Sequence, residues 1–354
     1  FTLYNHRIWG TIDVYKNSTK DLLMLTDIPS ITGFTASYAN IGQTSNKGLE
    51  ISISGVILKN QDWNITAGAN INFNRGNIDE LAEGLQSAYG TQFLQSGIPS
   101  SDYRLLEGKP VGIVMGYEMD GKGYYTPDDF NFDSTTGMYT LKTGVADLSK
   151  AFVSYRGGLV PGAQQAYPGL PKFKDATADG VIDDKDIVEI GNTNAKHTGG
   201  FNISANYKNI DLGMYFNWSY GNDVYNANKL ATLFNGNKGG GLYGNKLAIV
   251  KDSYTLYEIQ SGNLVRLTTP EKLNAANVNA TLPSTYLQQG YVSNIGNEDG
   301  SYLRLNTLTL GYTLPKQLLN KAKPSNIRVY GAIYNVFTLT GYSGLDPDVN
   351  SNQN

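Results

Sequence analysis

Six residues between positions 175 and 186 have the types and the spacing of a calcium-binding loop. The segment reads Asp-Ala-Thr-Ala-Asp-Gly-Val-Ile-Asp-Asp-Lys-Asp, and its candidate ligands are Asp175, Thr177, Asp179, Val181, Asp183 and Asp186. These are loop positions 1, 3, 5, 7, 9 and 12 of the EF-hand pattern, in which position 7 offers its backbone carbonyl and position 9 often acts through water. Gly180 stands at position 6, where that pattern needs a sharp turn. We therefore predict a structural Ca²⁺ in this loop, held so that clustered carboxylates fix one loop shape.

Two positions depart from the usual EF-hand residues. Asp186 is shorter than the glutamate found at position 12, and in this respect the loop resembles those of dockerin modules. Thr177 is a weaker ligand than Asp or Asn, so a modest affinity is expected. The alternative is a solvated acidic turn that holds no ion.

The sequence offers little for covalent chemistry. His6 and His197 are the only histidines, there is no cysteine, and neither H-E-x-x-H nor G-x-S-x-G occurs. The glycine-rich segment 236–244 is not followed by the Gly-Lys-Ser/Thr of a phosphate loop. Adjacent acids such as Asp128 and Asp129 could be imagined as a glycosidase pair, but acidic pairs are common in loops. We predict that the chain is not an enzyme and has no catalytic residue.

The composition is polar in an unusual way. Charged residues make up 17% of the 354 residues and the net charge is −3, while the chain holds 40 Gly and 25 Tyr. A near-neutral balance argues against a nucleic-acid partner. Soluble domains normally cover themselves with Lys and Glu, whereas uncharged polar residues with Tyr suit strands that have one wet face and one lipid face. No run of apolar residues is long enough for a membrane-spanning helix.

Hydrophobic residues recur with a period of two, which predicts strands. One face of the segment 63–74 carries Trp63, Ile65, Ala67, Ala69, Ile71 and Phe73, and the other carries Asn64, Thr66, Gly68, Asn70, Asn72 and Asn74. The segment 49–57 alternates in the same way and is separated from it by Asn60, Gln61 and Asp62, which predicts a hairpin. Similar alternation recurs in 201–208, 210–220, 307–312 and 326–340.

The connections between these runs alternate in length. Short connections are expected near residues 5–7, 60–62, 107–110, 208–209 and 314–326, and long ones near 20–42, 79–100, 119–196 and 222–300. Outer-membrane barrels combine short periplasmic turns with long outer loops in this manner. The fold class predicted is all-β, an antiparallel transmembrane barrel of which about ten strands are present. A secreted β-sandwich or β-helix is the alternative.

Aromatic residues divide between two expected roles. Tyrosines and phenylalanines in the long segments could stack on sugars or pack within their loops, and packing is favoured for Tyr124, Tyr125, Tyr155, Tyr167, Tyr225, Phe234 and Tyr243. Residues near strand ends are expected in interfacial girdles, namely Trp9, Trp63, Trp218, Tyr220 and Tyr312. No substrate-binding residue is assigned.

Several segments together resemble the C-terminal half of SusC-like (RagA/SusC-type) transporters, the glycan-importing branch of the TonB-dependent outer-membrane receptors. The matching segments are 8–15 with 20–23, 40–42 with 46–50 (Asn-Lys-Gly-Leu-Glu), 107–112 with 116–117, 190–192 with 198–201, 219–222, 300–305, 309–312, 335–338, 342–344 and 346–347. The resemblance covers nearly the whole chain.

The resemblance implies a 22-strand barrel with an N-terminal plug. Residues 1–354 are then the C-terminal part of one barrel domain, and we expect the plug, the first half of the barrel and the closing strand to lie outside this sequence. The implied function is import of oligosaccharides across the outer membrane. The implied partners are a SusD-like surface lipoprotein, TonB acting through the plug, and outer-membrane lipid. Peptide import by the same architecture, and a surface adhesin or glycan-binding protein without transport, are the other hypotheses.

Overall fold

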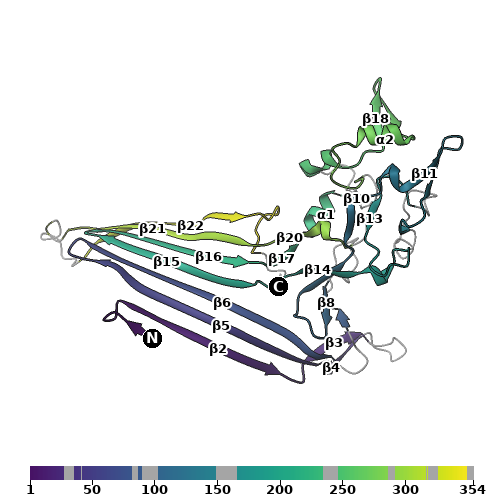
Figure 1. Ribbon diagram of the computed structural model, residues 1–354. Helices are drawn as coiled ribbons and strands as arrows, with labels where there is room; N and C mark the ends of the chain where they lie inside the picture. The colour runs from purple at the N-terminus through teal and green to yellow at the C-terminus, as the bar shows by residue number, and fades with distance from the viewer. Residues whose placement is uncertain are drawn as a thin grey trace.

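A long antiparallel sheet dominates the molecule (Figure 1). The computed structural model describes residues 1–27, 36–40, 42–81, 87–89, 103–148, 166–233, 246–285, 292–315, 317 and 326–348. The sheet has eight strands in the order β1-β2-β5-β6-β15-β16-β21-β22. Their bounds are β1 Thr2–Leu3, β2 Ile8–Thr19, β5 Gly42–Lys59, β6 Trp63–Leu81, β15 His197–Tyr207, β16 Ile210–Tyr220, β21 Tyr302–Thr313 and β22 Arg328–Thr340. The predicted antiparallel all-β class is confirmed.

Tight turns join neighbouring strands at one end of the sheet, which we call the short-turn rim. Between β5 and β6, the side-chain oxygen of Asn60 accepts hydrogen bonds from the backbone amides of Asp62 (2.9 Å) and Trp63 (2.8 Å). Asn therefore closes this hairpin through its own side chain, as Asx turns do. Between β15 and β16, Lys208 has a φ of 51°, the left-handed conformation that two-residue hairpin loops need.

The opposite end, the long-segment rim, is where residues 20–41, 82–196 and 221–301 connect the strands. Among the described residues the long sheet has eight strands, whereas the sequence predicted about ten strands in the barrel wall. The strands on either side of residues 107–110 belong to a separate four-stranded sheet, in the order β14-β9-β8-β7. The short turn there packs on the end of β6, because the Gly108 amide donates to the Ile78 carbonyl (2.8 Å) and the Ile78 amide donates to the Lys109 carbonyl (2.9 Å). A short connection is thus not by itself evidence of a turn at the short-turn rim.

The remaining elements lie beyond the long-segment rim and form small sheets and short helices (Figure 1). The strands are β3 Leu23–Asp27, β4 Ala36–Asn40, β7 Ser87–Tyr89, β8 Tyr103–Leu106, β9 Ile113–Gly116, β10 Met119–Tyr124, β11 Phe130–Asp133, β12 Met138–Leu141, β13 Pro171–Phe173, β14 Val188–Asn192, β17 Asp223–Tyr225, β18 Tyr257–Gln260, β19 Asn263–Arg266 and β20 Asn297–Asp299. The α-helices are α1 Ala227–Leu233 and α2 Pro270–Ala276. The 3₁₀ helices are η2 Pro127–Asp129, η4 Asp184–Asp186, η6 Ala248–Asp252 and η7 Asn294–Gly296. Within the described ranges, no helix is both long enough and apolar enough to cross a membrane.

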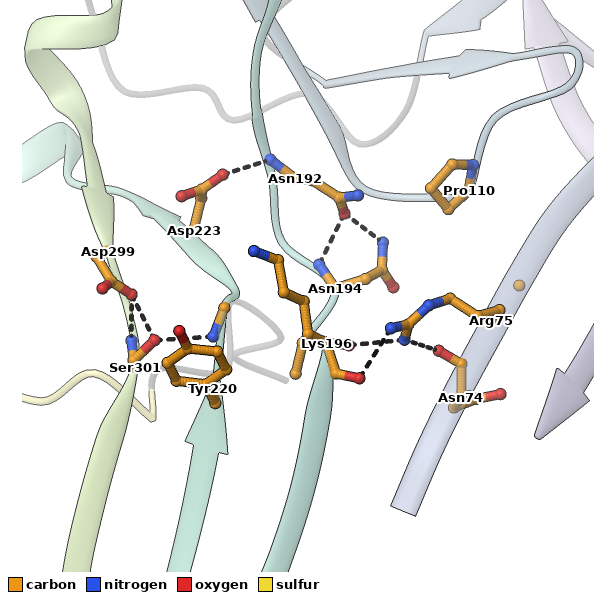
Figure 2. Close-up of a pocket in the computed structure, with 13 residues that line it drawn as sticks. Asn74, Arg75, Pro110, Asn192, Asn194, Lys196, Tyr220, Asp223, Asp299 and Ser301 are labelled. Carbon is orange, nitrogen blue, oxygen red and sulfur yellow. Dashed lines mark hydrogen bonds between the residues drawn. The ribbon is translucent and has the colours of Figure 1, made fainter. Parts of the chain in front are cut away.

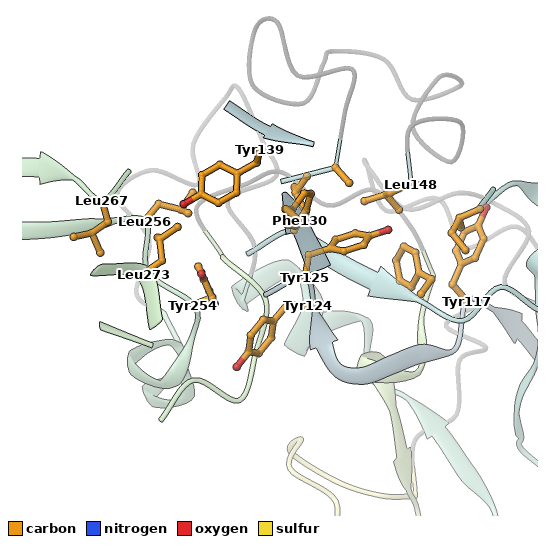
Figure 3. Close-up of a cluster of buried hydrophobic side chains, with 14 residues drawn as sticks. Tyr117, Tyr124, Tyr125, Phe130, Tyr139, Leu148, Tyr254, Leu256, Leu267 and Leu273 are labelled. Atoms are coloured by element: carbon orange, nitrogen blue, oxygen red, sulfur yellow. The ribbon is translucent and has the colours of Figure 1, made fainter. Parts of the chain in front are cut away.

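The elements beyond the long-segment rim together form a lobe. The main hydrophobic core lies in this lobe and not in the sheet (Figure 3). It is rich in tyrosine, and its fully buried members include Tyr125, Phe173, Ile182 and Leu273. The Tyr125 hydroxyl donates to the Ala146 carbonyl (2.6 Å), and the Tyr139 hydroxyl donates to the Thr268 carbonyl (2.9 Å). Buried phenols are therefore satisfied, which lets a core with many Tyr side chains hold together.

Candidate functional site

The sheet has one polar face, built by strand register from residues far apart in the sequence. A row of mutually opposite residues crosses seven strands and consists of Thr11, Ser52, Asn70, Gly200, Asn217, Arg304 and Thr338. Asn70 accepts a hydrogen bond from the Gly200 amide (2.7 Å), and Asn217 donates to the Tyr302 hydroxyl (3.2 Å). This face consists mainly of amides and hydroxyls, as the alternation of residues 63–74 predicts.

The other face is apolar and largely exposed. The neighbouring row on that face consists of Ile12, Ile51, Ile71, Gly199, Trp218, Leu303 and Leu339. Val14 is 79% exposed and Val329 is 63% exposed. Large contiguous apolar patches are rare on soluble monomers and mark contact with a partner or with lipid.

Aromatic side chains gather at both ends of the apolar face. At the short-turn rim Trp63 packs on Tyr207, with ring centroids 4.5 Å apart. At the long-segment rim His197 stacks on Tyr220 (5.0 Å) and accepts a hydrogen bond at Nδ1 from the Trp218 indole N–H (3.1 Å). These contacts agree with the girdle expected for Trp63, Trp218 and Tyr220. Trp9 differs, because it lies opposite Ser54 and so belongs to the polar face.

The spacing of the two aromatic groups fits the thickness of a membrane. Phe73, whose ring lies 5.7 Å from that of His197, is ten residues beyond Trp63 on β6. Ten residues of strand extend roughly 33 Å, and a tilt of about 40° reduces this to about 25 Å along the membrane normal. Transmembrane barrels have an apolar band of about that height between their aromatic girdles.

A pocket of about 660 Å³ opens at the long-segment rim (Figure 2). Its lining combines amides, hydroxyls and charges of both signs: Asn74, Arg75, Gly76, Pro110, Asn192, Asn194, Ala195, Lys196, Tyr220, Gly221, Asp223, Asp299 and Ser301. The volume is in the range of small-molecule sites. Sequence reasoning missed this pocket, because its lining comes from separate segments that no local motif connects.

Hydrogen bonds fix most of the pocket wall. The Arg75 guanidinium donates to the backbone carbonyls of Asn74 (2.7 Å) and Lys196 (2.9 Å), so that this arginine ties β6 to the start of β15. The Asp223 carboxylate accepts from the Asn192 amide (2.8 Å), and Asp299 accepts from the Ser301 amide (2.9 Å). The two acids therefore act as acceptors for backbone donors, while Arg75 keeps its positive charge without a carboxylate partner among the described residues.

Two charged contacts attach the segment after β22 to the long-segment rim, and sequence reasoning missed both. Arg304, nearly buried on the polar face, pairs with Asp346 and donates through Nε to the Thr338 hydroxyl (3.0 Å). Glu298 contacts the Lys229 ammonium (2.9 Å) and accepts from the Ser343 amide (2.7 Å). Each contact joins residues that lie tens of positions apart.

The predicted calcium loop has a defined conformation. The Asp175 carboxylate accepts from the Asp179 amide (3.2 Å) and the Gly180 amide (2.7 Å), and Gly180 has a φ of +82°. Desolvation raises the pKa of Asp175, but these amide hydrogen bonds outweigh it and the net pKa is lowered. Ile182 is fully buried in the main core and anchors the loop there.

The last residue of the loop is used differently from an EF-hand ligand. Asp186 is 1% exposed, and its carboxylate accepts from the amides of Ala176 (2.9 Å), Thr177 (3.1 Å) and Asp183 (2.8 Å). The Thr177 hydroxyl also donates to Asp186 (3.1 Å), and Asp183 accepts from the Lys185 amide (2.9 Å). Over the ranges that the structure describes, no three His, Cys, Asp or Glu side chains are grouped so as to hold a metal ion. The first turn is thus closed on the Asp175 carboxylate, whereas Asp186 organises the backbone of the rest of the loop.

Among the aromatic residues considered for sugar stacking, Tyr124 and Tyr125 are buried (Figure 3), while Tyr167 and Tyr225 are partly buried. Tyr124 is 2% exposed and Tyr125 is 0% exposed, so both pack in the lobe core as expected. Burial raises the pKa of Tyr125, and burial raises that of Tyr139 to about 12. Tyr167 packs edge-on against Tyr139, with ring centroids 5.2 Å apart. The other candidates Tyr155, Phe234 and Tyr243 lie outside the described residues.

Comparison with known proteins finds similarity to TonB-dependent receptors. The TonB-dependent receptor P3 of Formosa agariphila is 29% identical over 355 residues, which cover 98% of this chain and 29% of that protein. The TonB-dependent receptor SusC of Bacteroides thetaiotaomicron is 25% identical over 362 residues, covering 99% of this chain and 29% of SusC. The chain is homologous to TonB-dependent receptors, SusC among them. It spans less than a third of the length of these relatives. No protein-family model matches the sequence.

Solved structures give the same fold. The RagAB peptide importer in its closed-closed state superposes with a TM-score of 0.66 at 24% identity, covering 98% of this chain and 31% of the matched chain. The RagAB peptide transporter superposes with a TM-score of 0.64. This likeness supports a partial antiparallel β-barrel as the fold of the eight-stranded sheet. The relatives are named as receptors and importers, which agrees with the prediction that the chain is not an enzyme.

Proposed function

We propose that the full protein imports a nutrient across the outer membrane as a TonB-dependent, SusC-like pore. The observation that carries this proposal is that the sheet has two different faces. On one face a row of seven mutually opposite residues is polar or Gly, and on the other face the adjacent row is apolar or Gly. In a barrel such a wall separates lipid from a wet lumen. Homology to TonB-dependent receptors supports the same conclusion.

The placement in the membrane follows from the two rims. The apolar face lies against lipid with its aromatic groups at the two interfaces, the short-turn rim faces the periplasm, and the lobe lies outside the cell. The open edges at β1 and β22 pair with strands that are not in this sequence, since unpaired strand edges in lipid cost several kcal/mol per group. A plug that contacts TonB and a SusD-like surface lipoprotein complete the importer.

An oligosaccharide is the proposed substrate. Amides and hydroxyls such as those of Asn70, Asn217 and Tyr302 offer both donors and acceptors to a neutral, hydroxyl-rich ligand. Two basic side chains of the wall are paired with acids, Arg304 with Asp346 and Arg328 with Asp211, whereas Asp13 and Glu50 lie opposite each other on the same face. The many uncharged donors and acceptors of the wall suit passage of uncharged sugars.

A peptide is the second candidate, because the fold matches the RagAB structures that are described as a peptide importer. Peptides would use the same amides, and their charged termini would meet the charged pocket at the long-segment rim, which includes Lys196 and Asp299.

Native mass spectrometry of the full-length protein, purified in mild detergent from its source membranes, tests the function. We expect bound species whose masses differ by that of a sugar residue. We also expect uptake of a labelled oligosaccharide, and this uptake should stop when TonB is deleted. Bound amino-acid mass ladders and TonB-dependent uptake of a labelled peptide would move the assignment to peptides. Normal surface display with no TonB-dependent uptake of either substrate would overturn import in favour of an adhesin.

We also propose that the 175–186 loop binds a structural Ca²⁺ on the outer side of the barrel. The ligands would be Asp175, Thr177, Asp179, the Val181 carbonyl, Asp183 and Asp186, and the conformation of the first turn supports this. To bind the ion, the Asp186 carboxylate must give up hydrogen bonds from backbone amides and coordinate the metal instead. We expect the full protein to show luminescence from bound terbium, and added Ca²⁺ should displace the terbium. The variant Asp179→Asn should lose this signal, whereas Asp133→Asn should keep it. Absence of displaceable terbium would leave the loop as an acidic turn held by hydrogen bonds.

A further inference from the structure

Three basic residues form a row on the apolar face at the long-segment rim. Lys16 on β2 lies directly opposite Lys47 on β5, and Lys47 lies directly opposite Arg75 on β6. These strands lie side by side in the sheet (Figure 1). The three positions are separated by tens of residues in sequence, so that only the register of the sheet brings them together.

The row faces the same side as the apolar band. Side chains alternate along a strand, so Lys16 shares a face with Val14, and Arg75 shares a face with Phe73. Val14, Leu49 and Phe73 are themselves mutually opposite and form the last apolar row. The basic row therefore begins two residues beyond the edge of that band, at the level of Lys196 and the pocket (Figure 2).

No described acid forms an ion pair with this row. Like charges directly opposite one another destabilise a sheet, and all three residues are exposed. Within the described part of the chain, neither lysine forms an ion pair, and Arg75 donates only to carbonyls. Asp79 lies four residues beyond Arg75 on β6, where it accepts from Ser45 (2.7 Å) and Asn77 (2.8 Å); its charge interacts with that of Lys16, but the two form no ion pair. Asp13 and Glu50 are on the polar face and cannot approach the row from outside the barrel.

The short-turn rim has no such row among the described residues of the apolar face. Its outward side chains there are Trp63, Tyr207, Ile210, Tyr312 and Val329, which are mutually opposite across five strands. Lys59, an exposed lysine near that rim, lies opposite Asn64 and so belongs to the polar face, and Lys208 in the β15–β16 turn lies 4.0 Å from the Asp62 carboxylate. The basic row thus distinguishes one side of the membrane from the other.

We propose that Lys16, Lys47 and Arg75 form a binding site for the phosphate groups of lipid headgroups in the outer leaflet. An anionic headgroup seated above the apolar band would contact the row while its acyl chains lie on Val14, Leu49 and Phe73. Charge complementarity and continuity with the lipid-facing band both point to lipid as the occupant. The inference rests on the proposed membrane placement, but it does not depend on which nutrient is imported.

The test uses the full-length protein in a neutral detergent with short-chain phosphatidic acid as the anionic probe and phosphatidylcholine of the same chains as the reference. Native mass spectrometry counts the bound lipids. The matched variants are Lys16→Gln/Lys47→Gln, which leaves the Arg75 hydrogen bonds intact, and the control Lys59→Gln. Each lysine near an anionic headgroup contributes about fivefold in affinity, so the double variant should bind phosphatidic acid about thirtyfold more weakly. Added salt should weaken wild-type binding, while phosphatidylcholine and Lys59→Gln should show no change.

Equal binding of phosphatidic acid by wild type and the double variant would overturn the lipid site. The lipid site would also be overturned if inorganic phosphate bound as tightly as the lipid. The same holds if the double variant lost a co-purified acidic protein while its lipid binding stayed unchanged. TonB-dependent uptake is measured on the same preparations. Normal uptake with no preference for phosphatidic acid refutes the lipid site alone, whereas failure of the wild-type protein to enter membranes refutes both proposals.

Discussion

Arg328 on β22 reaches over Gly311 on β21 to pair with Asp211 on β16. Its Nε donates to Asp211 Oδ1 at 2.8 Å, and Nη2 contacts the second carboxylate oxygen, so the pair is bidentate. A Cβ at Gly311 would come within 2.4 Å of Asp211 Oδ1 and within 2.5 Å of Arg328 Nη2. The glycine therefore leaves the space through which a charge pair connects three strands of the polar face.

Gly311→Ala should consequently destabilise the barrel. The methyl group forces the two charged side chains apart, and overpacking of this kind costs about 1–3 kcal/mol. Gly331→Ala is the control, because a Cβ at Gly331 meets nothing within 4 Å. Heat-dependent mobility of the full protein in gels should show a lower unfolding temperature for Gly311→Ala only. Equal temperatures for both variants would mean that the pair does not depend on this space.

Glu298 should hold the segment after β22 against the long-segment rim in a pH-dependent way. Desolvation raises its pKa, but hydrogen bonds from Lys229 and Ser343 outweigh this, and the net pKa lies below the ordinary 4.5. A lowered folded-state pKa adds stability that is fully present above about pH 4.5 and is lost as the pH falls through the folded value. Hydrogen-exchange protection of the Ser343 amide, corrected for intrinsic rates, should decline over that acidic range.

The variant Glu298→Gln should reduce the same protection at neutral pH. Hydrogen bonds to charged groups contribute about 1.5–3 kcal/mol, and the Glu298 side chain is 11% exposed. Glu107→Gln, an exposed turn residue, should leave Ser343 unchanged. Wild-type protection in Glu298→Gln would show that other contacts hold the segment.

Tyr125 should stabilise the outer lobe through its hydroxyl as well as its ring. The side chain is fully buried, and its hydroxyl donates to the Ala146 carbonyl at 2.6 Å. Tyr125→Phe removes that donor and should cost about 1 kcal/mol, whereas Tyr125→Ala also leaves a cavity and should cost about 3–5 kcal/mol. Chemical denaturation followed by lobe tyrosine fluorescence measures both. Tyr334→Phe, 70% exposed, serves as the control and should have no effect.

The lobe should also unfold at alkaline pH before the sheet does. Burial raises the pKa of Tyr125 and of Tyr254, and raises that of Tyr139 to about 12, from an ordinary value of 10.0. A raised phenol pKa gives stability that is fully present below pH 10 and decreases as the pH rises toward the folded value. Tyrosinate absorbance should therefore appear in two steps, the second coinciding with loss of lobe structure. A single step near pH 10 with the lobe intact would contradict this.

Asp186 should be needed for the shape of the acidic loop even without metal. Its buried carboxylate accepts from three backbone amides, and Asp186→Asn replaces one of its acceptor oxygens by a donor. With a chelator present, this variant should lose about 2 kcal/mol of lobe stability, because hydrogen bonds to a charged group are worth about 1.5–3 kcal/mol each. Asp184→Asn, an exposed neighbour, is the control. If Asp186→Asn and wild type have the same lobe stability in the presence of a chelator, the Asp186 carboxylate serves only to bind the ion.

Much of the wall was determined by the sequence alone. Alternation from Trp63 to Asn74 assigns each side chain to a face, because the strand period is a local property. Asn60 closes its hairpin with its own side chain, so the β5–β6 turn could also be predicted. The order of residues in the 175–186 loop likewise determined its first turn.

Only the tertiary structure decided which distant residues meet. The row of Lys16, Lys47 and Arg75 depends on strand register, and a shift of one residue would turn each side chain to the other face. The turn at residues 107–110 looked like a barrel turn until its backbone was found paired with Ile78. Asp186 reads as a ligand in sequence but is buried as an acceptor for amides. Ladder pairing and burial are non-local, since they depend on contacts across many residues of chain, and no local pattern encodes them.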